Sequence, residues 1–175
     1  MRTRTISLVA ALALVAGTAV AARPALAQVD DPTICAIFDA ANTWDIQTGQ
    51  LAAERGSSKE VRDFGAMLAR DHKQVRQLGR DLATKLHVTP TPPKDFALAK
   101  AHVDAMKTLR GLHGKAFDKA FLDHEVAYHQ AVIDAVSTTL LPSTKNAELK
   151  DLEQKVAPAF AAHRDAAKNL LAKAN

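Results

Sequence analysis

Apolar side chains recur every three or four residues along most of this 175-residue chain. An α-helix turns 100° per residue, so this spacing gathers them on one stripe, whereas a half-buried strand needs strict alternation. Alanine, leucine, lysine, glutamate and glutamine are abundant in the same stretches, and all are good helix formers. The pattern therefore predicts an all-α fold.

Glycines and prolines divide this pattern into four long helices and one shorter helix. A connection of only two residues, which begins at Gly56, joins the first two long helices, so these must lie antiparallel. A longer connection, which holds the short helix, joins the second and third long helices and predicts a ferritin-like four-helix bundle. Pro142 and Ser143 are expected to form the last turn. The five helices are predicted at about residues 31–55, 58–87, 94–112, 115–140 and 144–172.

The first residues resemble a secretory signal peptide. Two arginines precede an apolar stretch at residues 6–20, and the small-x-small pattern of residues 25–27 suits signal peptidase. The alternative, a membrane anchor, needs about 20 apolar residues, more than this stretch offers. We expect residues 1–27 to be cleaved, with Ala22 as a weaker site, and residues 28–175 to form a single helical-bundle domain in the periplasm.

Charge and cysteine usage limit the possible partners. Loss of residues 1–27 removes three arginines and no acidic residue, so the formal charge falls from +4 to +1. A nearly neutral chain predicts neither nucleic-acid binding nor stable membrane insertion after cleavage. A second copy of the chain or another envelope protein is the expected partner. Cys35, the single cysteine, is either a small buried residue or forms a disulfide with a second subunit.

Acidic and histidine side chains interrupt the inner stripe of each long helix near its middle. An unpaired buried carboxylate costs several kcal/mol, so such groups pair, lose their charge or bind a cation. Mixed imidazole and carboxylate ligands suit zinc, iron, manganese or copper. The sequence predicts either a metal site or a hydrogen-bonded polar cluster, built from Asp45, Asp71, His72, Glu125, His129 and His163.

The spacing of these residues argues against a di-iron centre. Such a centre takes Glu-x-x-His from two helices, but Ala69 and Phe160 stand three residues before His72 and His163. Glu125 and His129 are four apart instead of three. A mononuclear site fits better. Asp118 is expected to cap or pair locally, and four histidines are expected in solvent: His87, His102, His113 and His124.

Motifs for catalysis are absent from the sequence. It contains no glycine-rich phosphate loop, no Gly-x-Ser-x-Gly and no His-Glu-x-x-His. We therefore predict no catalytic residue and no organic cofactor, and we do not expect an enzyme.

Several short motifs together resemble a known family. They are Gly49-x-Leu51-Ala52, Val61-x-x-Phe64, Asp71-His72, Phe117-Asp118, His129, and Pro158 ahead of His163. In order and spacing they are similar to the exported, ferritin-like domain-of-unknown-function 4142 family of bacterial envelope proteins. The resemblance implies a ferritin-like four-helix bundle of unassigned activity. It covers Asp71, His72, His129 and His163, places Asp45 where the family usually has glutamate, and does not include Glu125.

Two hypotheses about function follow. In the first, the protein is a periplasmic bundle that binds a transition metal in its core. In the second, it is a metal-free structural or stress-related envelope protein, whose polar core fixes helix register and whose surface binds a partner.

Overall fold

The structure, a computed structural model, describes residues 29–94 and 96–174, and within them all regular structure is helical. The predicted all-α fold is confirmed. The predicted signal peptide, residues 1–27, lies outside the described residues. The helices are α1 (Asp31–Arg55), α2 (Lys59–Lys85), α3 (Ala97–Gly111), α4 (Gly114–Ala135), the π-helical segment η1 (Val136–Leu140), α5 (Leu141–Ser143) and α6 (Ala147–Ala174).

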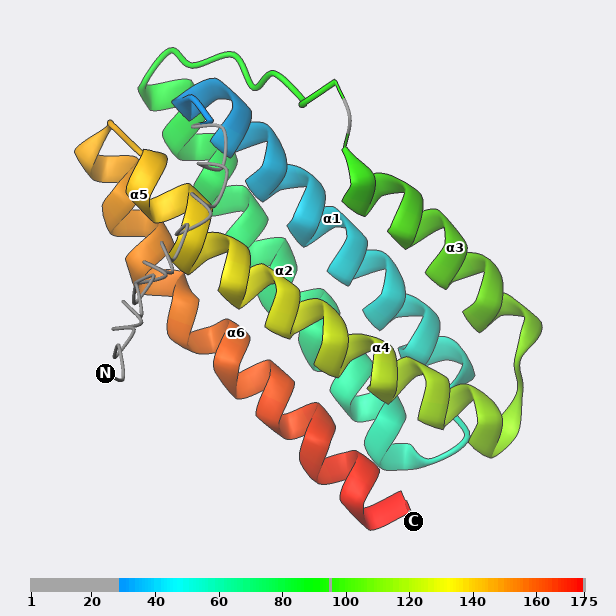
Figure 1. Ribbon diagram of the computed structural model, residues 1–175. Coiled ribbons are helices and arrows are strands. Elements are labelled where there is room, and N and C mark those ends of the chain that lie inside the picture. Colours follow the sequence, from blue (N-terminus) through cyan, green and yellow to red (C-terminus); the bar gives the residue numbers. More distant parts are fainter. Residues whose placement is uncertain (1–28, 95, 175) are drawn as a thin grey trace, which may run out of the picture.

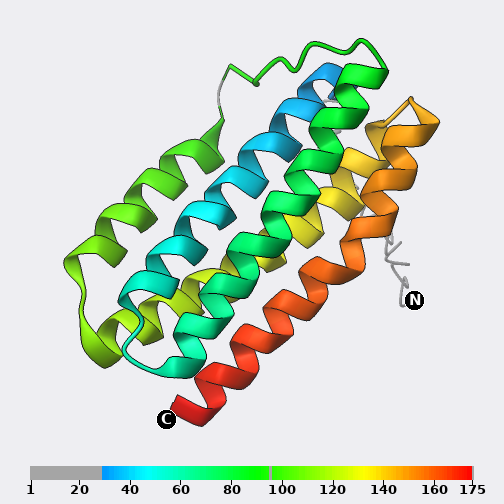
Figure 2. The same ribbon diagram turned by 180° about the vertical axis from the view of Figure 1, so that it is seen from behind.

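The four long helices form the predicted bundle. In Figures 1 and 2, α1, α2, α4 and α6 lie side by side, and α4 continues through η1 into α5. Helix α1 packs mainly on α2, and α4 mainly on α6. The shorter helix α3 lies outside the bundle, beside α1, in the crossover between α2 and α4. The architecture is therefore the four-helix bundle with one extra helix that the sequence predicts.

Aspartates organise the end of the bundle where α1 begins. The N-cap of α1 is Asp30, whose Oδ1 accepts a hydrogen bond from the Thr33 N–H (2.9 Å). Asp31 instead accepts from the backbone N–H groups of Lys145 and Asn146 (2.9 and 3.0 Å). Its carboxylate thus ties the start of α1 to the turn before α6.

The prediction that Pro142 and Ser143 form the turn before the last helix is wrong. The chain remains helical through Ser143, and α6 starts only at Ala147. Proline has no N–H to donate, and its ring collides with the preceding turn of a regular α-helix. The wider π turn of η1 directly before it accommodates the proline.

Helices α1 and α2 approach closely because two glycines face each other. A Cβ atom on Gly65 would lie 2.6 Å from the Gly49 carbonyl oxygen, and one on Gly49 would lie 2.7 Å from the Gly65 oxygen. Real side chains do not fit at such distances. The two glycines therefore set the separation of α1 and α2.

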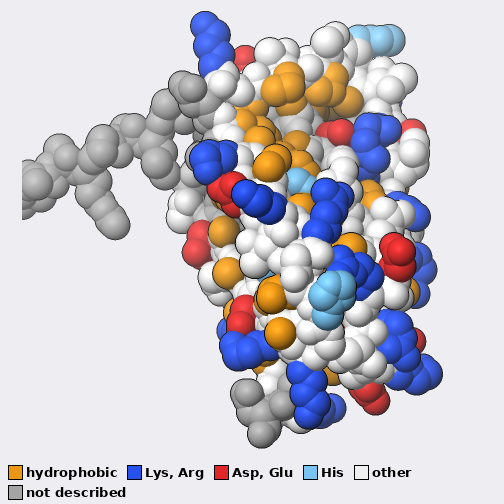
Figure 3. Space-filling view, turned by 90° about the vertical axis from the view of Figure 1, so that its right-hand side faces the viewer, with side chains coloured by type: hydrophobic (Ala, Val, Ile, Leu, Met, Phe, Trp, Pro, Cys, Tyr) orange, Lys and Arg blue, Asp and Glu red, His pale blue; other side chains and the backbone are white. Residues whose placement is uncertain are grey.

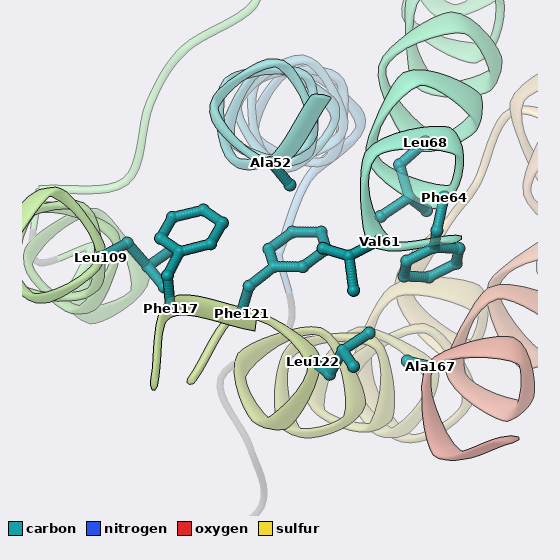
Figure 4. Close-up of a cluster of buried hydrophobic side chains, with 9 residues drawn as sticks. All are labelled: Ala52, Val61, Phe64, Leu68, Leu109, Phe117, Phe121, Leu122 and Ala167. Carbon is teal, nitrogen blue, oxygen red and sulfur yellow. The ribbon is translucent and has the colours of Figure 1, made fainter. Parts of the chain in front are cut away.

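Three apolar clusters fill the bundle. One, at the end where α1 meets α2, contains the side chains in Figure 4: Ala52, Val61, Phe64, Leu68, Leu109, Phe117, Phe121, Leu122 and Ala167. A second is formed by Phe38, Leu152, Val156 and Phe160. A third lies toward the opposite end and contains Ile34, Cys35, Ala83, Val136, Leu140 and Leu149. Cys35 is buried in that cluster, in line with its interpretation as a small buried residue.

Helix α3 is attached to α1 by aromatic contacts. The Trp44 ring lies 5.1 Å from the Phe96 ring and is stacked on His102 at 5.5 Å. The His102 Nε2–H donates to Gln47 Oε1 (2.7 Å). The prediction that His102 is solvated is therefore wrong, because this side chain lies on the face of α3 that packs against α1.

The other three histidines that were expected in solvent differ among themselves. His87 and His113 are exposed, as predicted. His124 is half-buried and stacked on Tyr128 at 5.6 Å, so the prediction is wrong there too.

The surface is mixed in character. Figure 3 shows lysine and arginine side chains scattered over one face, with hydrophobic side chains gathered near its upper end. Among the helices that the structure describes, none is both long and apolar enough to span a bilayer.

Candidate metal centre

A polar layer crosses the bundle between two apolar clusters. On α1, Asp45 lies between Phe38 and Ala52, which belong to different clusters. The other long helices repeat this arrangement. On α2, His72 lies between Leu68 and Val75, and on α6, His163 lies between Phe160 and Ala167. On α4, Glu125 and His129 lie between Leu122 and Val132. Each helix thus carries its polar residues to the same level of the core.

Three histidines from three helices face one another in this layer. The ring centroids of His72 and His163 are 5.1 Å apart, those of His129 and His163 5.4 Å, and those of His72 and His129 5.6 Å. One ring nitrogen from each lies within 4.8 Å of the other two. The rings therefore form a nearly equilateral triangle.

Asn42 determines which nitrogen of His72 carries the proton. The Asn42 amide donates from Nδ2 to the Phe38 carbonyl oxygen (2.8 Å), which leaves Asn42 Oδ1 as an acceptor. His72 Nδ1–H donates to that oxygen (2.8 Å). The lone pair is therefore on His72 Nε2, which is buried and has no hydrogen-bond partner among the described residues. Metal-binding histidines are typically held in this way by their other nitrogen.

The same arrangement holds for His129 and His163. His129 Nδ1–H donates to the Glu125 carbonyl oxygen (3.0 Å), and Nε2 is left buried without a partner among residues 29–94 and 96–174. His163 Nε2 faces Asp71 Oδ2 at 3.4 Å, and here Nδ1 is the buried nitrogen for which the described residues offer no partner. All three imidazoles thus keep one free lone pair inside the core.

Two carboxylates complete the layer. Asp45 Oδ2 lies 3.4 Å from His72 Nε2 and 3.8 Å from His129 Nε2. Glu125 Oε2 lies 3.4 Å from His129 Nδ1. Asp45 Oδ1 and both Glu125 oxygens lack a hydrogen-bond partner within the described part of the chain, and the Glu125 side chain is 0 % exposed.

Burial and neighbouring charge shift the pKa values of this layer. Burial, and secondly the charge of Glu125, raises the pKa of Asp45 well above its usual range. Burial lowers the pKa of His72 to about 3, and His129 and His163 add to the effect. The imidazole of His72 is therefore neutral at pH 7, the form that binds metals.

The distances between the donor atoms of the polar layer match those between atoms that bind the same metal ion. Ligand nitrogens and oxygens lie about 2.1 Å from a zinc-like ion, so two tetrahedral ligands are about 3.4 Å apart. The distances of 3.4 and 3.8 Å from Asp45 Oδ2 to the two histidine nitrogens have this size and exceed an ordinary hydrogen bond. The donor set therefore fits a metal ion better than a set of ion pairs.

The metal-free protein should lose stability as the pH falls from 7 to 5. Four histidines, namely His72, His102, His124 and His163, have lowered pKa values, each mainly because of burial. Below pH 6.5 the unfolded chain binds protons that the folded chain does not, so stability is full above that pH and declines below it. His72 alone contributes a loss of about 2 kcal/mol between pH 6.5 and 5.

Asp45 and Glu153 act in the opposite direction, since burial raises the pKa values of both, but they are two groups against four. Urea unfolding at pH 7 and pH 5 with a chelator present measures the difference. Equal free energies of unfolding at the two pH values would contradict the buried, neutral state of these histidines.

Five of the six predicted site residues come together, and Asp71 does not. Asp45, His72, Glu125, His129 and His163 form two overlapping ligand groups that share His129. The Asp71 side chain is 34 % exposed and belongs to neither group. Its Oδ2 contacts His163 Nε2 on the solvent side of that ring, and its Oδ1 pairs with the Arg70 guanidinium (2.8 Å).

Asn42 and Tyr128 are residues that the sequence analysis missed. Asn42 stands three residues before Asp45 and four after Phe38, so its place on the inner stripe was a usable signal. Tyr128 O–H donates to the Ala41 carbonyl oxygen (3.0 Å), a contact between α4 and α1 that periodicity does not indicate.

Asp118 has the local role expected for it. Its carboxylate accepts from the backbone N–H groups of Ser57 and Ser58 (2.7 and 3.0 Å) and from the Ser57 hydroxyl (2.6 Å). It therefore anchors the turn between α1 and α2, away from the polar layer.

The fold and the polar layer define a helical bundle with a buried cluster of histidines and carboxylates. The chain belongs to the DUF4142 family, described as a domain of unknown function, which it matches over residues 15–170. No curated protein matches it. Among solved structures it is similar to "CopM in the Cu(II)-bound form", with a TM-score of 0.64 and 15 % sequence identity, over 83 % of this chain and 98 % of that one. At that identity the likeness concerns the fold alone.

Proposed function

We propose that this protein binds one divalent transition-metal ion in the core of its bundle. His72, His129, His163 and Asp45 are the ligands, and Glu125 lies beside His129. The observation that carries the proposal is the set of buried atoms without a hydrogen-bond partner among the described residues. They are Asp45 Oδ1, His72 Nε2, both Glu125 carboxylate oxygens, His129 Nε2 and His163 Nδ1.

The charges of the site suit a divalent cation. In the forms that bind a metal, two ionised carboxylates and three neutral imidazoles would carry a formal charge of −2, which one divalent ion would cancel. Isolated carboxylates are costly in a low-dielectric core, whereas a neutral assembly of ion and ligands is not. Binding would also supply the missing partners of the buried atoms.

The donor atoms favour copper(II) among the available ions. The site offers nitrogen and oxygen and no sulfur, which suits divalent ions instead of copper(I). Affinity for such sites rises along the first-row metals to a maximum at Cu²⁺ and is lower for Zn²⁺. A copper(II)-bound protein with a similar fold is in keeping with this choice. Zinc, iron and manganese are weaker candidates.

The burial of the ligands suits holding an ion and not turning over a substrate. A catalytic metal needs an open coordination position, and Glu125 and His129 are both 0 % exposed. We therefore propose a metal-buffering protein without enzyme activity. We propose the periplasm as the location of this role, because residues 1–27 resemble a signal peptide, and a second copy or an envelope protein as its partner.

Metal content tests this proposal directly. The mature protein, purified without a tag or chelator and dialysed against Cu²⁺ or Zn²⁺, should retain about one ion per chain by elemental analysis. His129→Ala removes the residue shared by both ligand groups and should abolish retention. His102→Ala is the matched control, since His102 is also buried but lies between α3 and α1, outside the polar layer.

Circular dichroism should show that both variants remain helical. Equal retention by the wild type and His129→Ala would refute the assignment of ligands. A wild type that retains no ion and gains no stability from added metal would refute the function. The polar layer would then be a device that fixes helix register, as in the second hypothesis.

A further inference from the structure

The buried site needs a route by which ions arrive and leave. We propose that they pass between α2 and α6, through Asp71 and His163, with Arg70 slowing the passage. This inference rests on the proposed metal binding and adds to it how the site exchanges its ion.

Apolar layers close the site along the bundle axis. On one side the Phe160 ring is stacked on His72, with centroids 5.8 Å apart and planes at 6°. On the other side, Phe64 and Phe121 pack against each other at 6.0 Å in the cluster of Figure 4. Moving a bare ion through such layers is opposed by a large desolvation cost.

The side between α1 and α4 is closed as well. Tyr128 reaches from α4 and donates its hydroxyl hydrogen to the Ala41 carbonyl oxygen of α1 (3.0 Å). His124 is stacked on Tyr128, and α3 lies outside with His102 buried against Trp44. An ion would have to displace a helix to pass there.

A polar path remains between α2 and α6. The Asp71 side chain is 34 % exposed, and its Oδ2 lies 3.4 Å from His163 Nε2. The His163 side chain is 8 % exposed, against 3 % or less for Asp45, His72, Glu125 and His129. Its ring lies 5.1 Å from His72 and 5.4 Å from His129. A path from solvent into the core therefore leads first to Asp71, then to His163 and finally to the core ligands.

The side chains of Asp71 and His163 are chemically suited to transfer a metal ion from solvent to the core ligands. A half-exposed carboxylate attracts a hydrated cation and can replace part of its water. His163 is the least buried of the three imidazoles and the one whose partner lies at the surface. Rotation of its ring would turn the free Nδ1 toward an ion held by Asp71 and then back toward the free nitrogens of His72 and His129, while the proton stays on Nε2.

Arg70 opposes this step because it occupies the same carboxylate. Its guanidinium lies 2.8 Å from Asp71 Oδ1, and its side chain is 72 % exposed. An arriving cation must displace it and meets its positive charge. Arg70 lies outside both groups of ligands, so it should affect the rate of loading and not the strength of binding.

Stopped-flow fluorescence can separate the rate of loading from the affinity. Trp44, the only tryptophan, adjoins Asp45, so Cu²⁺ in the site should quench its emission. The wild-type protein is mixed with Cu²⁺ for uptake and, once loaded, with excess chelator for release. The variants are Arg70→Ala and Asp71→Asn. Asparagine retains an oxygen that can accept from His163 Nε2–H.

We expect Arg70→Ala to take up Cu²⁺ about threefold faster and Asp71→Asn about tenfold more slowly, because the local charge guides the cation. Release should change in the same direction as uptake, so that the dissociation constant stays within about threefold. Arg80→Ala is the control. Arg80 is also an exposed arginine of α2 paired with an aspartate, Asp39, but it lies away from the passage, so wild-type rates are expected.

Wild-type uptake by Asp71→Asn would overturn the passage. Unchanged uptake with faster release and weaker binding would overturn it too, since Asp71 would then only orient His163. A wild type that binds no Cu²⁺ is recognised before any variant is compared. It would refute the proposed function, and the passage with it.

Discussion

Glu125→Leu is expected to make the metal-free protein more stable while abolishing most of its response to metal. The Glu125 side chain is fully buried, and neither of its oxygens has a hydrogen-bond partner in the described chain. A buried polar group without a hydrogen bond costs about 1–3 kcal/mol in lost hydration, and more when it is charged, so an apolar side chain of similar volume should recover that cost. The hydrogen bond from His129 Nδ1 goes to the backbone oxygen of residue 125, so it survives the change.

Added metal should make the wild type more stable than Glu125→Leu. At a free ion concentration 1,000 times the dissociation constant, binding adds about 4.1 kcal/mol to the wild type. A variant with about 100-fold weaker binding gains only about 1.4 kcal/mol at the same concentration. Urea unfolding at pH 8, with chelator and then with Zn²⁺, measures both quantities.

Glu153→Gln provides the control for Glu125→Leu. Glu153 is also a buried glutamate with one unpartnered oxygen in the described structure, but it accepts from the Thr144 hydroxyl (2.8 Å) outside the polar layer. Its replacement should leave the response to metal unchanged. A metal-free Glu125→Leu protein that is less stable than the wild type would contradict the view that Glu125 is retained for binding.

Gly65→Ala should destabilise the protein strongly and weaken metal binding as well. The added Cβ would meet the Gly49 oxygen at 2.6 Å and the Ala53 nitrogen at 2.7 Å. Both are backbone atoms that cannot rotate away, so α1 and α2 must separate. Overpacking of this kind typically costs about 1–3 kcal/mol, and we expect the upper end of that range.

The same separation would draw Asp45 on α1 away from His72 on α2, so the affinity for metal should fall together with stability. Gly111→Ala is the control, because a Cβ there meets nothing within 4 Å. Its free energy of unfolding should stay within about 0.5 kcal/mol of the wild type. Equal midpoints of urea unfolding for the two variants would contradict the packing argument.

Much of the candidate site follows from helical periodicity. Asp45, His72, Glu125, His129 and His163 were predicted on inner stripes, and the structure brings these five together. A residue's direction from a helix axis is a local property, because it depends only on its position along a regular backbone. The family motifs supported four of the six predicted positions but not Glu125, which periodicity alone identified.

Other features could not be predicted in this way. Asp71 and His72 are neighbours that straddle the stripe, and only the position of α6 decides that His72 points inward while Asp71 meets solvent. His102 belongs to the shorter helix α3, which lies outside the four-helix bundle, and its burial depends on docking against Trp44 of α1. The π segment before Pro142 likewise depends on the packing of α4 and α6 and not on a local breaker signal.

The sequence by itself determined the helices, their order and the polar residues that enter the core, because each of these follows from local spacing. Only the tertiary structure decided which nitrogen of His72 and of His163 is free. Asn42 on α1 sets that nitrogen for His72, and Asp71 on α2 sets it for His163. Such partners come from different helices, so they depend on how the whole bundle packs.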